Sequence, residues 1–359
     1  MRINNKEILP TIAVLLLLLL GLEIIARVFL APYEQPLCIF QADQKLGFRF
    51  QANAQATLEK QEYSVTIKTN SLGFRGPEPR AQKTGTRILV IGDSWVVGQG
   101  VSEEQAFSRL LEKDLAKQGA DAETINAGVS AYGTRQERIL LEELMPKIKP
   151  DVVLLAFYNG NDFSENDNGF LETTVLNGCI GRGTLFDKAK AFVFKNFRLA
   201  YFVEKRLELI EPFKTVFRSA GISGSAVPDS ITMMKKNPGR EFAAKEDATE
   251  KEILEIKKIS EDGGAKFAVA VIPAIMEIDN ARLETAAGYY GIPAARLDEN
   301  RITEYWQSFS DRTGIPAIYL EKNAGISAEM FYGGDGHWKP EGHAAAARAL
   351  AKFLPPNAK

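Results

Sequence analysis

Short runs of β-branched and aliphatic residues alternate along most of the chain with longer stretches whose apolar residues recur at helical spacing. Short apolar runs bounded by turn residues are typical of strands buried in a parallel sheet. Because strands and helices take turns, the pattern predicts an α/β fold with a parallel sheet wrapped by helices. The predicted strands are residues 87–91, 123–126, 151–157, 266–272 and 315–320, and the predicted helices include residues 104–118, 136–147, 280–290, 301–312 and 339–353.

Residues 1–31 depart from this alternation, because residues 8–30 are apolar with few interruptions. As a helix, residues 8–30 would be about 34 Å long, which is enough to cross a bilayer. Arg2 and Lys6 precede the apolar stretch and favour an N-terminus inside, with the rest of the chain exported to the periplasm or the cell surface. We therefore predict a membrane anchor over residues 1–31. The alternative is a cleaved signal peptide and a secreted protein.

A juxtamembrane segment, residues 32–84, is expected between the anchor and the main domain. Apolar and polar residues alternate over residues 63–69 and predict one strand. Arg75 follows in a glycine-flanked loop. We expect it in an ordinary surface salt bridge, with an anionic substrate as the alternative partner.

The main domain is predicted over residues 85–359, with an insertion at about residues 163–264. The insertion contains a helix candidate, residues 185–218, in which aromatic residues such as Phe192 and Phe197 alternate with lysines and arginines. An amphipathic helix that packs its aromatic side chains on the core is the favoured interpretation. A lid, or a face lying on the membrane surface, is the functional alternative.

Composition narrows the possible chemistry. The chain has 359 residues and a net charge of -2, which gives no reason to expect a nucleic-acid partner. Cys38 and Cys179 lack metal-ligand spacing, and either a disulfide or two unpaired thiols is consistent with the sequence. The histidines number only two, His337 and His343. We expect no metal and no cofactor, since scattered acids with two histidines do not make a ligand cluster.

Four loops contain residues whose side chains or backbone groups could take part in catalysis. Three of them follow predicted strands, and the fourth precedes the last helix. They contain Ser94, the small-residue loop 128–133, Asn161, and the pair Asp335 and His337. Serine is a weak nucleophile unless a base takes its proton, and the base needs an orienting acid. Backbone N–H groups and an asparagine amide can stabilise a developing oxyanion. The set is complete for acyl transfer.

The same loops resemble the four sequence blocks of the GDSL/SGNH hydrolase superfamily. The matching residues are Gly92-Asp93-Ser94, then Asn126, Gly128 and Gly133, then Gly160-Asn161-Asp162, and finally Asp335 with His337. The resemblance covers roughly residues 85–355 apart from the insertion. It implies a flavodoxin-like fold with a five-stranded parallel sheet flanked by helices. It also implies that Ser94 is the nucleophile, that His337 is the base, and that the oxyanion hole comprises the Ser94 N–H, an N–H of the second loop and the Asn161 side chain.

Two positions depart from the pattern of that superfamily. The usual glycine of the second block is Ala131 here, and Gly128 lies three residues earlier. Because the hole requires only a backbone N–H, we expect Ala131 to supply it, with Gly128 as the alternative. The acid usually lies three residues before the histidine, but that position is Gly334. Asp335, two residues before His337, is the candidate acid. The remaining histidine, His343, is expected to pack within the last helix.

The sequence thus predicts a membrane-anchored, extracytoplasmic serine esterase. It would act through an acyl-serine intermediate on O-acyl esters, above all O-acetyl esters, of an envelope glycan or lipid. An O-acyltransferase that modifies polysaccharide is one alternative, because the motif does not distinguish water from a second hydroxyl as acceptor. A non-catalytic carbohydrate-binding or scaffold protein is another. A nucleotide-binding module is disfavoured, since the chain has neither a G-x-G-x-x-G nor a Walker pattern.

Overall fold

A computed structural model describes residues 5–30, 34, 36–164, 166, 168–181, 185–207 and 227–354. The chain divides into two compact units. The first comprises Met1–Gln35 and Gly181–Ala226, and the second comprises Pro36–Ile180 and Val227–Lys359. Each unit is described by itself below.

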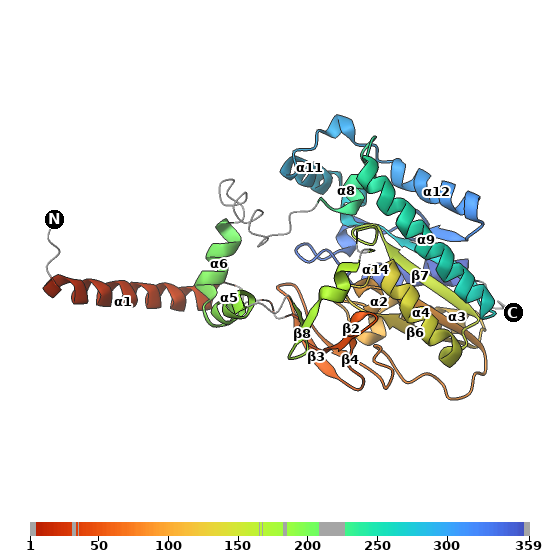
Figure 1. The fold of residues 1–359 in the computed structure, drawn as a ribbon, viewed down its shortest axis with the longest axis horizontal. Coiled ribbons are helices and arrows are strands. Elements are labelled where there is room, and N and C mark those ends of the chain that lie inside the picture. The colour runs from red at the N-terminus through yellow and green to blue at the C-terminus, as the bar shows by residue number, and fades with distance from the viewer. Residues whose placement is uncertain are drawn as a thin grey trace. The chain divides into compact units, whose positions relative to one another are not determined.

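A five-stranded sheet forms the centre of the second unit (Figure 1). Its order is β11-β10-β7-β5-β6, and every neighbouring pair is parallel. Counted from β6 by position in the chain, this order is 2-1-3-4-5, the flavodoxin-like arrangement. The fold class predicted from the sequence is therefore confirmed. The strands are β5 (Thr86–Gly92), β6 (Ala122–Gly128), β7 (Val152–Tyr158), β10 (Lys266–Ile272) and β11 (Ala317–Tyr319).

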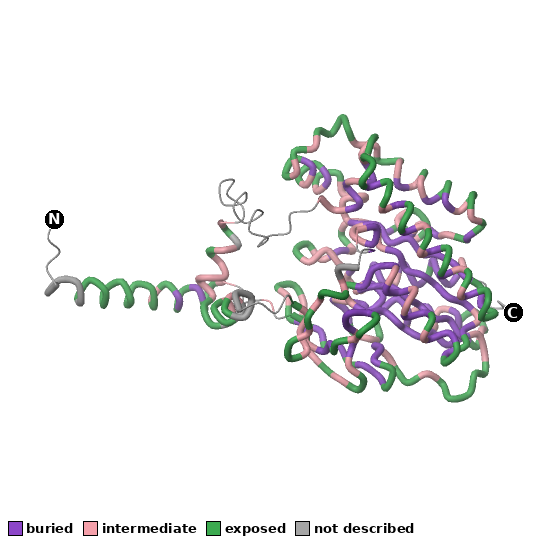
Figure 2. The backbone as a smooth tube through the Cα atoms, in the orientation of Figure 1, coloured by how far each residue is buried: buried purple, intermediate pink, exposed green. Residues whose placement is uncertain are grey.

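Helices cover both faces of the sheet, which explains why the strands read as continuous apolar runs. Along β5, Ile88 and Val90 pack with the helices of one face, and Leu89 and Ile91 pack with those of the other. The strands of the sheet form the buried centre of this unit (Figure 2). The first face carries α3 (Phe107–Lys117) and α14 (Pro340–Phe353), and the second carries α4 (Thr134–Ile148), α9 (Arg240–Asp262) and α12 (Arg301–Thr313).

Short helices complete the loops of this unit. The α-helical ones are α2 (Ser94–Val97), α8 (Asp229–Met233), α10 (Ile275–Ile278), α11 (Asn280–Tyr289) and α13 (Leu320–Ala324). The 3₁₀ turns are η1 (Glu103–Gln105), η2 (Asn168–Glu172), η3 (Ala294–Arg296) and η4 (Ala328–Met330).

The segment between the anchor and the sheet forms two antiparallel hairpins within the second unit. They are β1 (Phe40–Asp43) with β2 (Gly47–Phe50), and β3 (Gln55–Glu59) with β4 (Ser64–Lys68). The strand predicted at residues 63–69 corresponds to β4, whereas the other three strands were not predicted. Phe40, Phe48 and Phe50 are each only 2–3% exposed and join the core beside one sheet face.

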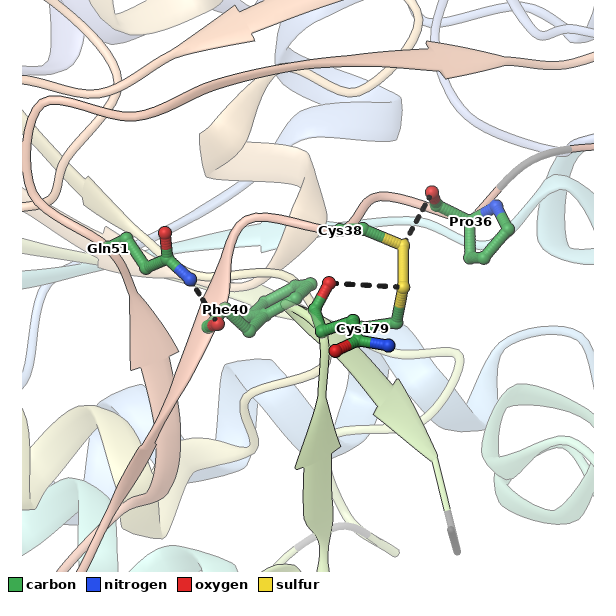
Figure 3. The surroundings of a disulfide bond; sticks show 6 residues. Pro36, Cys38, Phe40, Gln51 and Cys179 are labelled. Atoms are coloured by element: carbon green, nitrogen blue, oxygen red, sulfur yellow. Dashed lines mark hydrogen bonds between the residues drawn. A yellow bond between two sulfur atoms is a disulfide. The ribbon is translucent and has the colours of Figure 1, made fainter. Parts of the chain in front are cut away.

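Cys38 and Cys179 form a disulfide (Figure 3). It links the residues just before β1 to the hairpin of β8 (Thr174–Leu176) and β9 (Cys179–Gly181). The backbone N–H of Phe40 donates to the carbonyl of Gly178 at 2.8 Å beside the bridge. Of the two states that the sequence allowed, the structure contains the paired one.

The first unit contains α1 (Asn5–Phe29), α5 (Leu185–Asn196) and α6 (Arg198–Leu207). Within α1, Pro10–Phe29 has a mean hydropathy of 2.6 and is long and apolar enough to cross a membrane. The single helix predicted at residues 185–218 is instead two helices that meet at Phe197, and residues 208–218 lie outside the described part of the chain. Phe192 is 66% exposed and Phe197 is 49% exposed. Both side chains are thus exposed in this unit, and the expectation that the aromatic residues pack on the core of the main domain stays a prediction.

Candidate active site

Ser94 lies two residues beyond the carboxyl end of β5, as the first residue of α2. The side chain of Asp93 accepts a hydrogen bond from the N–H of Trp95 at 2.9 Å and caps this short helix. Gly92 is required just before the turn, because a Cβ there would lie 2.4 Å from the Val96 side chain. The tight turn presents Ser94 at the edge of the sheet where open α/β folds bind their ligands.

The structure brings Ser94, His337 and Asp335 together. The Ser94 Oγ lies 2.8 Å from His337 Nε2, and His337 Nδ1 lies 2.7 Å from Asp335 Oδ2. The histidine ring also packs against Trp95, with ring centroids 4.9 Å apart and the ring planes tilted by 36°. The candidate nucleophile, base and acid thus form one continuous hydrogen-bonded chain, which is the geometry required to activate a serine.

The charge of Asp335 determines which nitrogen of His337 carries the proton. Burial alone would raise the pKa of Asp335, but the hydrogen bonds from His337 and Tyr63 outweigh burial and hold this pKa at about 2. The ionised carboxylate can only accept, so His337 Nδ1 must carry a hydrogen. His337 Nε2 is then left with its lone pair toward the hydroxyl of Ser94, as a general base requires.

The geometry separates the two candidates for the backbone donor of the oxyanion hole. The Gly128 N–H donates to the side chain of Asn126 at 3.1 Å, and a Cβ on Gly128 would lie 2.6 Å from Val96. Gly128 therefore serves close packing against α2. Ala131 adopts a left-handed conformation with φ of 66°, and no acceptor for its N–H is found among the described residues. Ala131 therefore stays the predicted donor.

The other two predicted donors, Ser94 and Asn161, lie at the same edge of the sheet. Gly92 of β5 lies opposite Ala156 of β7 in parallel register, so Ser94 and Asn161 both follow the carboxyl ends of adjacent strands. The N–H of Ser94 is in the first turn of α2, where intrahelical acceptors are lacking. Asp162, next to Asn161, braces the loop by accepting from the N–H of Tyr158 at 2.7 Å.

His343 has the packing role that the sequence indicated. Its ring stacks on Phe107, and its Nδ1 accepts from the N–H of the same residue at 3.3 Å. Burial lowers the pKa of His343 to about 3, so the ring is neutral at physiological pH. His343 therefore supports α3 and α14 and takes no part in the chain of hydrogen bonds to Ser94.

Sequence reasoning missed a group of side chains that contact the Asp335 loop from the turn between β3 and β4. Tyr63 donates to Asp335 Oδ2 at 2.7 Å, and the Lys60 Nζ lies 3.7 Å from Asp335 Oδ1. The Glu62 carboxylate accepts backbone N–H groups of the same loop. These residues precede Asp335 by 272–275 positions in the chain, and no local pattern links them to it.

Arg75 also departs from expectation. Its guanidinium is buried and donates to three backbone carbonyls at the end of α2, those of Val97 (2.9 Å), Gly98 (2.8 Å) and Val101 (2.8 Å). No described carboxylate lies within ion-pair distance of it, and burial lowers its pKa to about 10. The expected surface salt bridge is wrong: Arg75 satisfies the carbonyls that a helix end leaves without partners.

Within the part of the chain that the structure describes, no group of three or more His, Cys, Asp or Glu side chains could hold a metal ion.

Comparison with known proteins gives one curated relative and several solved structures, whereas no family model matches the chain. The curated relative is the esterase TesA of Pseudomonas aeruginosa, with 32% identity over 81 residues. The match spans 23% of this chain and 40% of that relative, so less than half of the relative's length is covered.

The similar solved structures include a crystal structure of TesA, at 14% identity and a TM-score of 0.42, which covers 76% of this chain and 99% of that one. The acetyl xylan esterase AlAXEase is similar at 15% identity and a TM-score of 0.39, covering 75% of this chain and 100% of that one. A putative lipolytic protein of the G-D-S-L family from Desulfitobacterium hafniense is similar at 11% identity and a TM-score of 0.39, with 75% and 99% covered.

Proposed function

We propose that this chain is a serine ester hydrolase of the GDSL/SGNH type. The observation that carries the proposal is the chain of contacts from Ser94 Oγ through both ring nitrogens of His337 to Asp335, at 2.8 and 2.7 Å. The name of its curated relative, an esterase, supports the same reaction class.

The reaction follows from these contacts. Ser94 Oγ attacks the ester carbonyl carbon while His337 Nε2 takes the hydroxyl proton, and Asp335 stabilises the imidazolium that forms. The oxyanion receives hydrogen bonds from the N–H groups of Ser94 and Ala131 and from the Asn161 amide. The tetrahedral intermediate expels the alcohol, which takes the proton from His337, and leaves an acyl-Ser94. Water, activated by the same histidine, then releases the carboxylic acid.

The placement of the reaction is extracytoplasmic, with the chain held to a membrane by α1. Pro10–Phe29 supplies the span, and the Cys38–Cys179 bridge is of the kind that persists in oxidising compartments. An O-acylated envelope glycan is the substrate class that fits this placement, with lipid esters second. An O-acyltransferase would use the same acyl-Ser94 with a sugar hydroxyl in place of water.

The helices α5 and α6 extend the membrane contact of α1. Glu23 of α1 accepts the N–H groups of Arg198 and Leu199 at the start of α6, both at 3.0 Å, and pairs with Arg27 at 2.8 Å. A carboxylate inside a span is tolerated when it is paired in this way. A groove of about 530 Å³ between α1 and α6 is lined almost wholly by apolar side chains. This unit therefore offers an apolar surface to lipid beyond that of the span.

Photo-cross-linking of the full chain in lipid vesicles tests this placement. We would introduce p-benzoylphenylalanine at Leu17 of α1 and at Phe197. The control position is the exposed Tyr289 of the second unit, which contains Ser94 and is called the catalytic unit. Lipid adducts at Leu17 and Phe197, but not at Tyr289, are expected. Adducts at Leu17 alone would restrict the membrane contact to α1. An adduct from Phe197 to the catalytic unit would make α5 and α6 a lid.

Hydrolysis of p-nitrophenyl acetate by the full chain in detergent tests the function, beside Ser94→Ala and His337→Ala. We expect steady hydrolysis by the wild type and loss of about four orders of magnitude or more in each variant. A burst of p-nitrophenol without turnover would favour the acyltransferase. Equal rates in all three proteins, or no hydrolysis by any of them, would contradict the proposal and favour a non-catalytic carbohydrate-binding protein.

A further inference from the structure

We propose that the turn between β3 and β4, residues 60–63, positions the catalytic acid Asp335, with Glu62 and Tyr63 as positioning residues. The inference rests on the proposed function, because it assigns a role in the same reaction to a segment outside the α/β sheet. We call residues 60–63 the positioning turn.

Glu62 holds the backbone of the loop that carries Asp335, residues 332–338, which we call the acid loop. Its two carboxylate oxygens accept three successive N–H groups, from Gly333 at 2.8 Å, Gly334 at 2.6 Å and Asp335 at 3.2 Å. Two neighbouring glycines make this stretch costly to order, since glycine has more conformational freedom to lose than other residues. Burial raises the pKa of Glu62, but the three N–H donors outweigh it and lower this pKa, so the carboxylate is ionised at neutral pH. A charged acceptor therefore fixes the backbone that carries Asp335.

Tyr63 fixes the carboxyl group of the acid itself. Its hydroxyl donates to Asp335 Oδ2 at 2.7 Å, the same oxygen that faces His337 Nδ1 at 2.7 Å. The Lys60 Nζ lies 3.7 Å from the other oxygen, Oδ1. With a donor or cation on each oxygen, rotation of the carboxyl group would break at least one contact. The positioning turn thus sets the orientation in which Asp335 meets the histidine.

Tyr63 packs on Tyr332 of the acid loop, and Tyr332 is itself anchored to the region after α2. The rings of Tyr63 and Tyr332 lie 4.8 Å apart, and the Tyr332 hydroxyl donates to the carbonyl of Gly100 at 2.9 Å. Arg282 of α11 donates to the carbonyl of Gly333 at 2.9 Å from another element. Tyr332 lies in the same loop as Asp335 and His337. Its contacts therefore help to fix the loop that carries the acid, as well as Tyr63.

Tyr63→Phe tests the inference with the smallest change, since it removes only the hydroxyl. A hydrogen bond to a charged group is lost, and we expect kcat for p-nitrophenyl acetate to fall about tenfold with KM changed less than twofold. Tyr319→Phe is the matched control, because it removes another tyrosine hydroxyl that donates to a carboxylate, Glu277, at 2.6 Å. It should keep kcat within about twofold of the wild type.

A double-mutant cycle distinguishes positioning from general structural support. If Tyr63 acts through Asp335, Tyr63→Phe should have no further effect on single-turnover acylation in an Asp335→Asn background. A purely structural role would lower the rate by the same factor in both backgrounds, and that result would overturn the inference.

Glu62 provides a second test through rescue and pH dependence. Glu62→Ala should lower kcat about tenfold, and Glu62→Gln, which keeps an acceptor oxygen, should recover at least half of the lost activity on a logarithmic scale. In Glu62→Ala the acidic half-maximum of the kcat/KM profile should move to lower pH, because a loosened Asp335 stabilises the imidazolium less. Among the described residues, the charged or titratable groups that face this loop or its own members are Lys60, Glu62, Tyr63, Asp93, Arg282, Tyr332, Glu341 and the buried His343.

The outcomes separate failure of the inference from failure of the proposed function. Wild-type activity in Tyr63→Phe and Glu62→Ala, beside an inactive Ser94→Ala, would overturn the positioning role and leave the esterase intact. Equal rates in the wild type and in Ser94→Ala would overturn both.

Discussion

Two stretches of this chain lie outside the five-stranded sheet, and both are rich in phenylalanine, but their side chains have opposite environments. In the hairpins of residues 40–68, Phe40, Phe48 and Phe50 are buried against the sheet. In α5 and the residue that follows it, Phe192 and Phe197 are 66% and 49% exposed. The first stretch extends the core up to the candidate active site, whereas the second belongs to the unit of the apolar helix α1.

The difference shows that a phenylalanine in the sequence predicts an apolar environment but not whether protein or lipid supplies it. A phenylalanine gains about the same free energy from burial in protein as from contact with lipid, so its presence alone does not identify its environment. The neighbouring residues carry the distinction. Lysines and arginines are interleaved with the aromatic residues of α5 and α6, as is typical of helices that lie at a membrane surface.

The largest effect is expected at the acid that the hairpin segment contacts. Asp335→Asn keeps the shape of the side chain but places an amide beside His337 Nδ1, which favours the wrong tautomer of the imidazole. We expect the rate of p-nitrophenyl acetate hydrolysis to fall about 10⁴-fold. Circular dichroism would check that the variant is folded. A variant that keeps more than about a tenth of wild-type activity would show that another group orients His337.

A matched pair of substitutions tests the contrast in burial itself. Phe50→Ala, at a position 2% exposed, should lower the free energy of unfolding by about 3–5 kcal/mol. Phe192→Ala, at a position 66% exposed, should change it by no more than about 0.5 kcal/mol. Urea denaturation of the full chain in detergent, followed by tryptophan fluorescence, measures both. Similar losses in the two variants would contradict the contrast.

The disulfide sharpens the comparison, because it joins the start of the first stretch to the β8–β9 hairpin within the same unit. Cys38 and Cys179 are separated by 141 residues, so the bridge restrains a long loop of the unfolded chain. Replacing both cysteines by serine should lower the free energy of unfolding by about 2–5 kcal/mol. At temperatures where the variant stays folded, ester hydrolysis should be close to that of the wild type. Unchanged stability under denaturant would contradict a structural role for the bridge.

The smallest effect on catalysis is expected from the second stretch. The double variant Phe192→Ser with Phe197→Ser should hydrolyse p-nitrophenyl acetate within about twofold of the wild-type rate, because both side chains are exposed and belong to the unit of α1. The same protein should bind more weakly to lipid vesicles. A large loss of hydrolysis with unchanged vesicle binding would reverse the assignment and indicate a lid.

Local patterns were sufficient to predict the sheet and the three residues that meet at its edge. The apolar run 87–91 and the turn after it place Ser94, and the scarcity of histidine limits the base to His337 or His343. The hydrogen bond from Ser94 to His337 then follows from the topology, which brings the loops after the strands to one edge.

Local sequence patterns could not predict the contacts between segments that are far apart in the chain. Glu62 and Tyr63 lie in an unremarkable turn, and their significance depends on a loop more than 270 residues later. Arg75 was expected in an ordinary surface salt bridge, because that is the commoner role of an arginine. Its partners are instead backbone carbonyls at the end of α2. Which carbonyls lack a backbone partner depends on the folded structure and cannot be predicted from a local sequence pattern.

The most direct test of this account is the site of covalent modification by a fluorophosphonate, which reacts with activated serines and mimics the tetrahedral intermediate. The full chain would be labelled in detergent beside His337→Ala, digested, and mapped by peptide mass spectrometry. We predict a single adduct on Ser94 that is lost in His337→Ala. An adduct on another serine, or equal labelling of Ser94 in the two proteins, would contradict the claim that His337 activates Ser94.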